Sequence, residues 1–368
     1  AAIAERKLAG RGLTRPELAV LLAYGKLELK REIVASAAPD DPWFETHLEA
    51  YFPKPLRKWK DPIRRHRLRR DIIATVVAND MINRCGPSFP FRMMAAAGCG
   101  VTALLSGYEA AKVVLDFEAR WAAVRALDLK IPAQGQLALF RRLVASLRGA
   151  TFWLARRAAR EGLDVAALVQ RYGPGFKSLD RLTPEALPAV ERAAVEARTA
   201  QLVEAGAPED IARTVAALGP LTTAADLVDL AEGSSWALPN VARLYYAAGE
   251  AMAFDRLRAA AGEFRAGDLF ERTALRRLIE DLLGEQAQLT RAIMDFVGNA
   301  KAGVDAEHAR DAVASWASLR SEQVVAATRT IDEIEAAGGG WTFAKLTIAN
   351  AALRELAQEA ASGRKRRG

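Results

Sequence analysis

The densest group of chemically active side chains lies between residues 54 and 70, called here the basic segment. It carries nine lysines and arginines against one acid, Asp61, and so exceeds the net charge of +7 of the whole chain. Clustered cationic groups of this kind bind phosphate or carboxylate oxygens. The candidate contact residues are its five most closely spaced arginines: Arg64, Arg65, Arg67, Arg69 and Arg70.

Two glycine motifs resemble phosphate-binding loops. Residues 98–103, Gly-Cys-Gly-Val-Thr-Ala, fit the G-x-G-x-x-G/A pattern of dinucleotide sites, but residues 92–97 before them are helix formers rather than a strand. We therefore predict a helix that ends on glycine. Residues 173–178 lack the Gly-Lys-Ser order of a phosphate loop and contain Pro174, so we predict a turn at residues 173–175.

No other pattern predicts catalysis or metal binding. The three histidines, His47, His66 and His308, are far apart and form no metal-binding pair, and the two cysteines form no CxxC motif. No G-x-S-x-G motif is present. From the residues alone we predict no catalytic, cofactor-binding or metal-binding site in this chain.

The composition favours an all-α protein. Of the 368 residues, 51% are hydrophobic and 26% charged, which is enough for a sizeable core. Alanine is abundant, and Ala, Leu, Glu and Arg lose least on entering a helix. Because no convincing run alternates apolar and polar residues, we predict a multi-helix bundle with no significant β-sheet.

Helix boundaries follow from caps and breakers. Thr14 and Glu17 form a capping box that predicts a helix to about Ser36, and Asp61 with Pro62 predicts a second helix to about Arg84. A short helix is expected at residues 43–52. Further helices are expected at about residues 103–126, 134–161, 164–172, 184–204, 208–217, 223–232, 239–261, 268–299, 305–337 and 342–361.

The helix expected from Pro62 would place Arg64 and Arg65 in its first turn, where the helix dipole disfavours cations. Such a cluster is better explained if the guanidinium groups reach carboxylates. We therefore expect at least two of the five arginines to pair with Asp or Glu.

Domain boundaries are expected at the Gly/Pro/Ser-rich stretch near residues 173–183. We predict a helical subdomain over residues 1–175, a second over 176–361 and a flexible basic tail over 362–368. A single continuous bundle is the alternative.

The chain begins with Ala1 and shows no secretory signal, so we expect a segment excised from a longer protein. No apolar stretch reaches the roughly 18–20 residues of a membrane helix. A cytoplasmic protein with reduced cysteines and no membrane contact is expected.

Several segments resemble the large bacterial NAD-specific glutamate dehydrogenases just beyond their catalytic domain. The most specific is Leu-Thr-Arg-Pro-Glu-Leu-Ala-Val-Leu-Leu-Ala-Tyr at residues 13–24, and residues 41–43, 51–53, 63–75, 126–128 and 131–133 agree with it. Weaker likeness continues through residues 236–239, 243–246 and 272–278.

The resemblance implies a helical C-terminal region of an enzyme that deaminates L-glutamate oxidatively with NAD. The catalytic residues and the NAD site would lie upstream, so none is carried onto this chain. The implied partners are the catalytic and N-terminal regions of the same protein, and the full-length enzyme is expected to be a homo-oligomer.

Two roles for the basic segment remain open at this stage. The first is packing against the other regions of the protein, in oligomer assembly or regulation, with the five arginines at the contact. The alternative is nucleic-acid binding, because Trp59 lies among the basic residues. We favour the first and expect no nucleic-acid partner; a solvated surface without a partner is the third reading.

Overall fold

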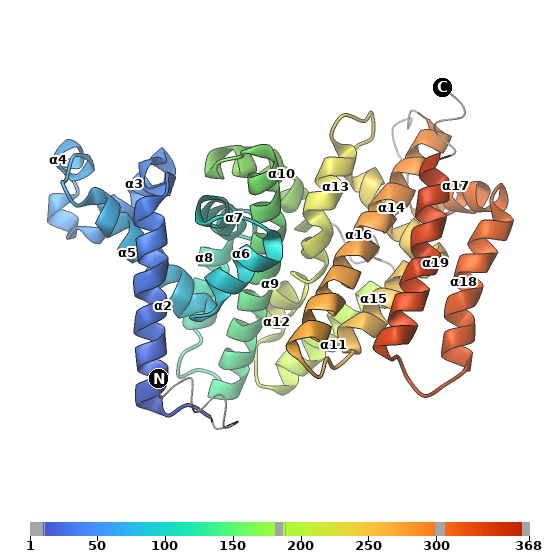
Figure 1. Cartoon of the computed structure of the whole chain (residues 1–368), viewed down its shortest axis with the longest axis horizontal. Helices are drawn as coiled ribbons and strands as arrows, with labels where there is room; N and C mark the ends of the chain where they lie inside the picture. The colour runs from blue at the N-terminus through green and yellow to red at the C-terminus, as the bar shows by residue number, and fades with distance from the viewer. Residues whose placement is uncertain (1–9, 11, 181–186, 188, 299–305, 363–368) are drawn as a thin grey trace. The chain divides into compact units, whose positions relative to one another are not determined.

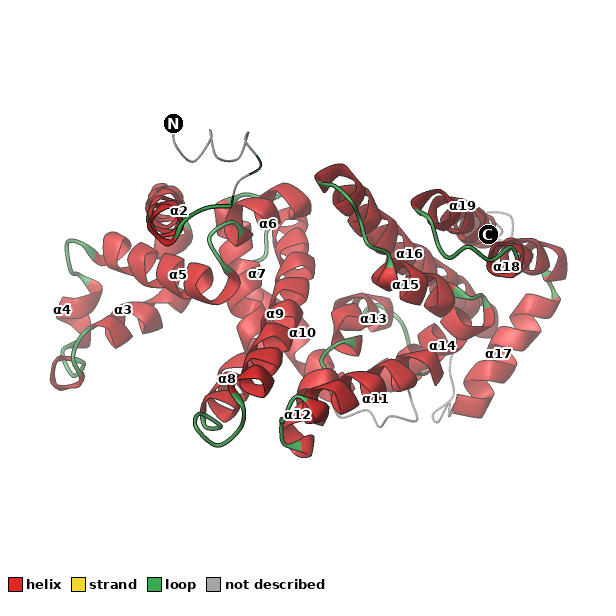
Figure 2. Ribbon diagram, turned by 90° about the horizontal axis from the view of Figure 1, so that it is seen from below, coloured by secondary structure: helices red, strands yellow, loops and turns green. Residues whose placement is uncertain are grey.

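The fold is entirely helical in the part of the chain that is described. The structure is a computed structural model that describes residues 10, 12–180, 187, 189–298 and 306–362. Every regular element in these ranges is an α-helix or a 3₁₀-helix, and no strand occurs among them (Figure 2). The predicted all-α fold without a sheet is confirmed. The basic tail predicted at residues 362–368 lies outside the described residues, apart from Ser362.

The chain divides into two compact units, Ala1–Pro174 with Ala205–Ala207, and Gly175–Glu204 with Pro208–Gly368. Whether they are separate domains stays a prediction. The elements of the first unit are α2 (Arg15–Ala35), η1 (Ala38–Asp40), η2 (Pro42–Phe44), α3 (Glu45–Tyr51), η3 (Lys54–Leu56), α4 (Lys60–Arg64), α5 (Arg69–Cys85), α6 (Phe89–Ala97), α7 (Val101–Val114), α8 (Phe117–Arg125), α9 (Ala133–Glu161) and the start of α10 (Val165–Asp180).

In the second unit, α16 lies along α19 and α14 packs against α17 (Figure 1). Arg354 of α19 joins the two long helices through Asp281 at 2.6 Å and Glu285 at 2.8 Å. After the end of α10, the elements of this unit are α11 (Ala189–Glu204), α12 (Glu209–Ala216), η5 (Pro220–Thr223), α13 (Ala224–Ala231), α14 (Leu238–Ala251), α15 (Phe254–Glu263), α16 (Leu269–Val297), α17 (Ala306–Ser318), α18 (Ser321–Ala336) and α19 (Phe343–Ser362).

The capping box predicted at the start of α2 is confirmed. The backbone N–H and the hydroxyl of Thr14 both lie 2.7 Å from the Glu17 carboxylate, which accepts their hydrogen bonds. The helix ends at Ala35, next to the predicted Ser36.

The continuous helix predicted from Pro62 to Arg84 is wrong. Instead α4 ends at Arg64, and α5 starts separately at Arg69. Within the break, the backbone N–H of Leu68 donates to Nδ1 of His66 at 3.2 Å. The imidazole thus gives the backbone a local partner that competes with helical hydrogen bonding.

The turn predicted at residues 173–175 is also wrong, because α10 continues through it to Asp180. Its buried side chains recur at helical spacing on both sides of the proline: Val165, Leu168, Tyr172, Phe176 and Leu179. Since the residue before a proline clashes mainly through its Cβ, glycine at position 173 reduces that cost. Burial of this face outweighs the helix-breaking tendency of the sequence.

Three helices predicted as continuous are each two helices. The breaks fall between α7 and α8, between α14 and α15, and between α17 and α18. At the first two, Asp116 (φ 46°) and Ala253 (φ 62°) adopt the left-handed conformation that non-glycine residues rarely take. Each is followed by a fully buried phenylalanine, Phe117 or Phe254. The change of direction lets that ring enter the core, which offsets the backbone strain.

Helix α7 is the centre of the first unit. All nine residues from Leu104 to Lys112 are buried, so this stretch of the helix has no solvated face. It lies against α9 so closely that a Cβ on Gly107 would be 2.4 Å from the backbone nitrogen of Ala155. Only glycine permits this approach.

Two charged residues lie on this buried helix and must be paired. The Glu109 carboxylate lies 3.0 Å from Nζ of Lys112 and accepts a hydrogen bond from His47 of α3 at 3.2 Å. Burial alone would raise the pKa of Glu109, but His47 and Lys112 outweigh it and lower the pKa to about 2. Lys112 also reaches Asp80 of α5 at 3.3 Å.

Among the described residues, no single helix is both long and apolar enough to cross a membrane. One pair of helices, α6 with α7, passes on combined length and composition only, and it is bent by 105°.

Substitution Glu109→Gln is expected to lower the free energy of unfolding at pH 7 by roughly 3–5 kcal/mol, because it leaves Lys112 buried without its closest carboxylate. The folded pKa of Glu109, about 2, lies below the ordinary 4.5, so its contribution is complete above about pH 4.5 and disappears as the pH falls toward 2. In urea unfolding, the difference in the free energy of unfolding between this variant and the unmodified chain should therefore be smaller at pH 3.5 than at pH 7. The control, Glu333→Gln at an exposed pair, should change stability by less than about 1 kcal/mol.

Substitution Gly107→Ala is expected to destabilise the protein by roughly 1–3 kcal/mol or more, because the new methyl group overlaps the backbone of α9. The matched control is Gly284→Ala in α16, where a Cβ meets nothing within 4 Å. That change should stabilise by roughly 0.4–1 kcal/mol. Equal thermal shifts for the two variants would contradict the close α7–α9 contact.

Candidate functional site

The basic segment spans η3, α4 and the first residues of α5 in the first unit (Figure 1). Its neighbour α3 is held in the first unit by buried side chains. Leu48 is fully buried, and Phe44, just before α3, is buried and stacks on His47 at 5.8 Å between ring centroids. Because His47 also bonds to Glu109, the position of α3 is fixed by the buried charges of α7.

Helix α3 presents two carboxylates to the basic segment. Glu45 and Glu49 are four residues apart and so lie on one face of the helix. Arg64 bridges them, with Nε 2.9 Å from Glu45 and a terminal nitrogen 3.3 Å from Glu49. Lys60 approaches Glu49 at 3.8 Å. This part of the cluster is neutralised within the chain.

A second carboxylate neutralises the start of α5. Asp40 forms ion pairs with both Arg69 and Arg70. The hydrogen bond from Arg70, together with the charges of both arginines, holds the pKa of Asp40 below its ordinary value. Asp71, in the first turn of α5, pairs with Lys30 of α2 at 3.2 Å.

The sequence analysis placed Arg64 and Arg65 in the first turn of a helix, and this placement is wrong. Arg64 lies in the last turn of α4, where a cation is favoured, whereas Arg69 and Arg70 occupy the first turn of α5. The predicted outcome is nevertheless confirmed, since Arg64, Arg69 and Arg70 all have carboxylate partners within this chain. Their role in contact with another domain stays a prediction.

Two arginines have a role that the sequence did not predict: they cap the carboxyl ends of helices. Arg70 donates to the carbonyls of Val34 and Ser36, at 2.8 and 2.7 Å, at the end of α2. Arg57 donates to the carbonyls of Ala50 and Phe52, at 2.7 and 2.8 Å, at the end of α3. These carbonyls lack helical partners, so the arginines satisfy them. Arg70 is more than 30 residues from its helix end in sequence, and Arg57, although close to its own, belongs to no local capping motif that the sequence analysis used.

The remaining two candidate arginines are less engaged. Among the described residues, Arg65 contacts the carbonyl of Asp61, at 3.4 Å, and no carboxylate. Arg67 is exposed and has no partner in the part of the chain that the structure describes. In the same stretch of the chain, residues 51–68, four large apolar side chains have the following exposed fractions: Tyr51 58%, Leu56 47%, Trp59 57% and Leu68 46%. We call Tyr51, Leu56, Trp59, Leu68 and Arg67 the exposed patch.

The glycine motif at residues 98–103 joins two helices. Gly98, with a left-handed backbone (φ 62°), ends α6, and Gly100 precedes the first turn of α7. The prediction of a glycine-terminated helix is confirmed. The strand that places a pyrophosphate against a helix start in a dinucleotide fold is replaced here by α6.

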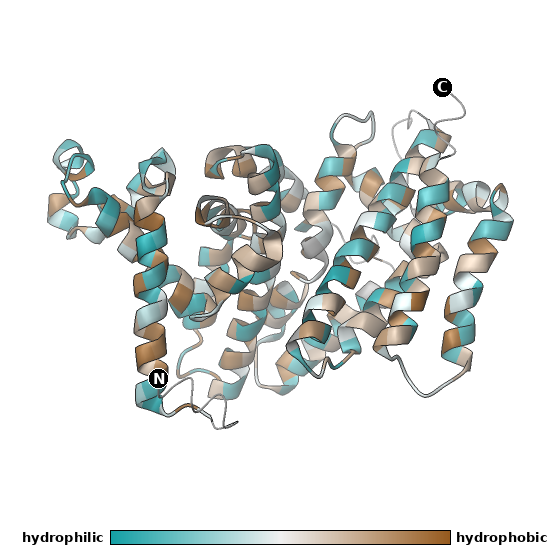
Figure 3. Ribbon diagram, viewed as in Figure 1, coloured by the Kyte–Doolittle hydropathy of each residue, from teal (hydrophilic) through white to brown (hydrophobic). Residues whose placement is uncertain are grey.

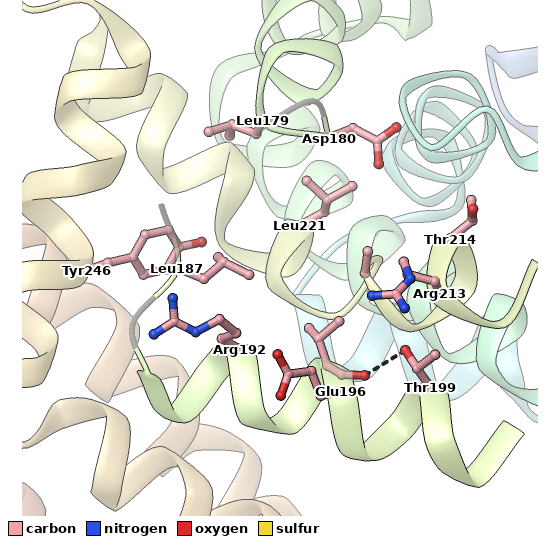
Figure 4. A pocket seen from close by; sticks show the side chains of 12 residues that line it. Leu179, Asp180, Leu187, Arg192, Glu196, Thr199, Arg213, Thr214, Leu221 and Tyr246 are labelled. Carbon is pink, nitrogen blue, oxygen red and sulfur yellow. Dashed lines mark hydrogen bonds between the residues drawn. The ribbon is translucent and has the colours of Figure 1, made fainter. Parts of the chain in front are cut away.

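A cavity of about 390 Å³ lies in the second unit (Figure 4). Its lining includes charged side chains of both signs and three hydroxyl groups. The charged residues are Arg192, Arg213, Asp180 and Glu196. Most of these polar groups are engaged locally: Arg213 pairs with Glu209 at 2.6 Å, and the hydroxyls of Thr199, Thr214 and Tyr246 bond to neighbouring groups of the same unit. The cavity therefore resembles a gap between satisfied helices rather than a prepared ligand site.

Within the described ranges, no three His, Cys, Asp or Glu side chains come together in a way that could hold a metal ion. Cys85 is buried, and this burial raises the pKa of its thiol to about 11, so the sulfur is a poor nucleophile at neutral pH.

Comparison with known proteins gives a consistent result. Residues 10–355 match the family model described as glutamate dehydrogenase, C-terminal. The chain is 31% identical over 362 residues to the NAD-specific glutamate dehydrogenase of Pseudomonas aeruginosa and 30% identical over 362 residues to that of Mycobacterium tuberculosis. It is 28% identical over 355 residues to that of Halomonas elongata. These alignments cover 96–98% of this chain but only 22% of each relative.

Substitution Arg70→Ala is expected to lower the free energy of unfolding by roughly 1–2 kcal/mol, because two helix-end carbonyls lose their partner and Asp40 loses one of its two arginines. Arg67→Ala is the matched control, since that side chain is exposed, and its effect should stay within about 0.5 kcal/mol. Chemical denaturation of both variants makes the comparison. Similar effects would mean that Arg70 does not act as a cap.

Proposed function

This chain belongs to the glutamate dehydrogenase C-terminal family, and we propose that it is the non-catalytic helical end of an NAD-dependent glutamate dehydrogenase. The full-length enzyme converts L-glutamate, NAD and water to 2-oxoglutarate, ammonia and NADH. Support comes from the relatives, which are named NAD-specific glutamate dehydrogenases and of which this chain spans 22%. The catalytic residues and the NAD site then lie in the other part of the polypeptide, and this chain carries none of them.

The proposed role of the chain is to pack against the catalytic and N-terminal regions, within one subunit or between subunits of a homo-oligomer. The observation that carries this role is the exposed patch. Trp, Tyr and Arg contribute most of the binding energy in protein interfaces, and here Trp59, Tyr51 and Arg67 lie exposed within 17 residues of one another in sequence. Large apolar groups gathered on one surface segment are typical of an interaction site.

The chemistry of the partner follows from the ion pairs already formed. Arg64, Arg69 and Arg70 are held by carboxylates of this chain, so of the five candidate arginines Arg65 and Arg67 are the ones available for an outside partner. A partner surface with one or two carboxylates beside apolar side chains fits this patch. The five-arginine contact proposed from the sequence thus reduces to two arginines with aromatic neighbours.

Nucleic-acid binding is the competing function for the same segment. It depends on many cations free to contact phosphates. Arg57, Arg64, Arg69 and Arg70 are occupied with carbonyls or carboxylates of this chain, which weakens that alternative. The isolated chain is expected to bind random oligonucleotides weakly, with an affinity that changes between 50 mM and 200 mM salt by much less than the roughly 1,000-fold expected of a site with six or more phosphate contacts.

The double substitution Trp59→Ala with Arg67→Ala is expected to weaken assembly of the full-length enzyme while leaving the melting temperature of the isolated chain nearly unchanged. Hydrogen exchange should show residues 51–68 exchanging at least about tenfold more slowly in the full-length enzyme than in the isolated chain, and the double variant should lose this protection. Sedimentation measures assembly of the full-length enzyme, and glutamate-dependent NADH formation measures its activity.

The control variant is Arg329→Ala, which removes an exposed arginine on α18 and should alter none of these measurements. Unchanged exchange of residues 51–68 between the two proteins would contradict the packing role. Oligonucleotide affinity that falls steeply with salt and disappears in the double variant would favour the nucleic-acid alternative.

A further inference from the structure

Helix α2 carries apolar side chains on two sides. Leu29 and Ile33 are fully buried against the first unit, where α2 packs on α5. Farther toward the N-terminus, Val20, Tyr24 and Leu27 are 45%, 69% and 63% exposed. Figure 3 shows hydrophobic bands along the N-terminal half of α2.

The exposed side chains form one stripe. Val20, Tyr24 and Leu27 stand at positions i, i+4 and i+7, which align along a helix. At 3.6 residues per turn this stripe faces roughly away from Leu29 and Ile33. We call these three residues the α2 stripe.

The stripe ends where charged residues begin. The next position on this side, four residues after Leu27, is Arg31, which pairs with Glu28 at 2.5 Å. The exposed stripe is therefore confined to the N-terminal half of the helix. In this half Leu21, 42% exposed, lies between the stripe and the buried side, and Leu18, 50% exposed, lies on the side of Leu29. A helix with apolar residues on opposite sides is typical of one that is buried between two bodies.

We propose that the α2 stripe docks an amphipathic helix of the region that precedes this chain in the longer polypeptide. This inference rests on the proposed function. The matched family is described as C-terminal, and the relatives hold most of their length outside the matched part, so a preceding region would join α2 through residues 1–14. A region joined to α2 by a connection in the same polypeptide has a raised effective concentration at the stripe.

The chemistry of the stripe defines its occupant. None of its three members is charged, so the occupant presents an apolar face, and the i, i+4, i+7 spacing suits ridge-into-groove packing of another helix. The charged pair of Glu28 and Arg31 marks the end of the contact. The α2 stripe and the exposed patch are thus two surfaces, of which the first carries no charge and the second also carries arginine.

The test places the photo-crosslinking residue p-benzoyl-phenylalanine at position 24 of the full-length enzyme, where it replaces a tyrosine of similar shape. Irradiation is expected to link position 24 to residues that precede this chain in the same polypeptide, as mapped by mass spectrometry. The control carries the same probe at position 333 on α18, where Glu333 is 72% exposed, and should give at least about tenfold less of this product.

A second measurement separates docking from folding. The double substitution Val20→Ser with Leu27→Ser should leave the melting temperature of the isolated chain nearly unchanged, and should reduce crosslinking from position 24 at least about tenfold. Crosslinks to a second copy of this chain, no product above the control, or a large loss of stability in the isolated chain would each overturn the proposal. Glutamate-dependent NADH formation by the same protein tests the proposed function independently, so the two failures are distinguishable.

Discussion

A buried carboxylate holds the first unit together. Glu109 lies on α7, a helix enclosed on all sides, and it can remain ionised only because Lys112 and His47 reach it. Removing a charge from water is costly, and removing one partner of a buried pair costs more than the pair contributes. The arrangement therefore fixes which helices may surround α7, since α3 must supply the imidazole and α5 must bring Asp80 to Lys112.

This constraint reaches the molecular surface through α3. His47 ties the inner face of the helix to Glu109, and on the same helix Glu45 and Glu49 hold Arg64. Arg57 and Arg70 then join the ends of α3 and α2 to the basic segment. Most of the conspicuous positive charge thus serves the fold, and the exposed patch is what remains for a partner. The position of that patch depends on a carboxylate that no partner can touch.

Local signals predicted local structure well. The Thr14–Glu17 capping box and the glycine end of α6 need only neighbouring residues, and both were found from the sequence. Features that depend on long-range burial were missed: Pro174 lies inside α10 because residues on both sides of it are buried, and Ala253 turns the chain so that Phe254 can enter the core. Pairing of the arginines was predicted from chemistry, but the identity of their partners depends on contacts between distant helices. The exposure of Trp59 and of the α2 stripe could not be predicted either, because an apolar residue in sequence does not say whether the fold covers it.

The return of the chain at residues 205–207 to the first unit has a practical consequence for dissection of the protein. Ala205–Ala207 belong with the first unit although the segments on either side belong to the second. They fit closely there: a Cβ on Gly135 would lie 2.4 Å from the carbonyl oxygen of Ala205, and one on Gly206 would lie 2.8 Å from the Pro132 ring. A single cut within α10 would therefore remove residues 205–207 from the first unit, where they pack against the start of α9. A circularly permuted or split version of this chain would have to keep that short excursion with the N-terminal half.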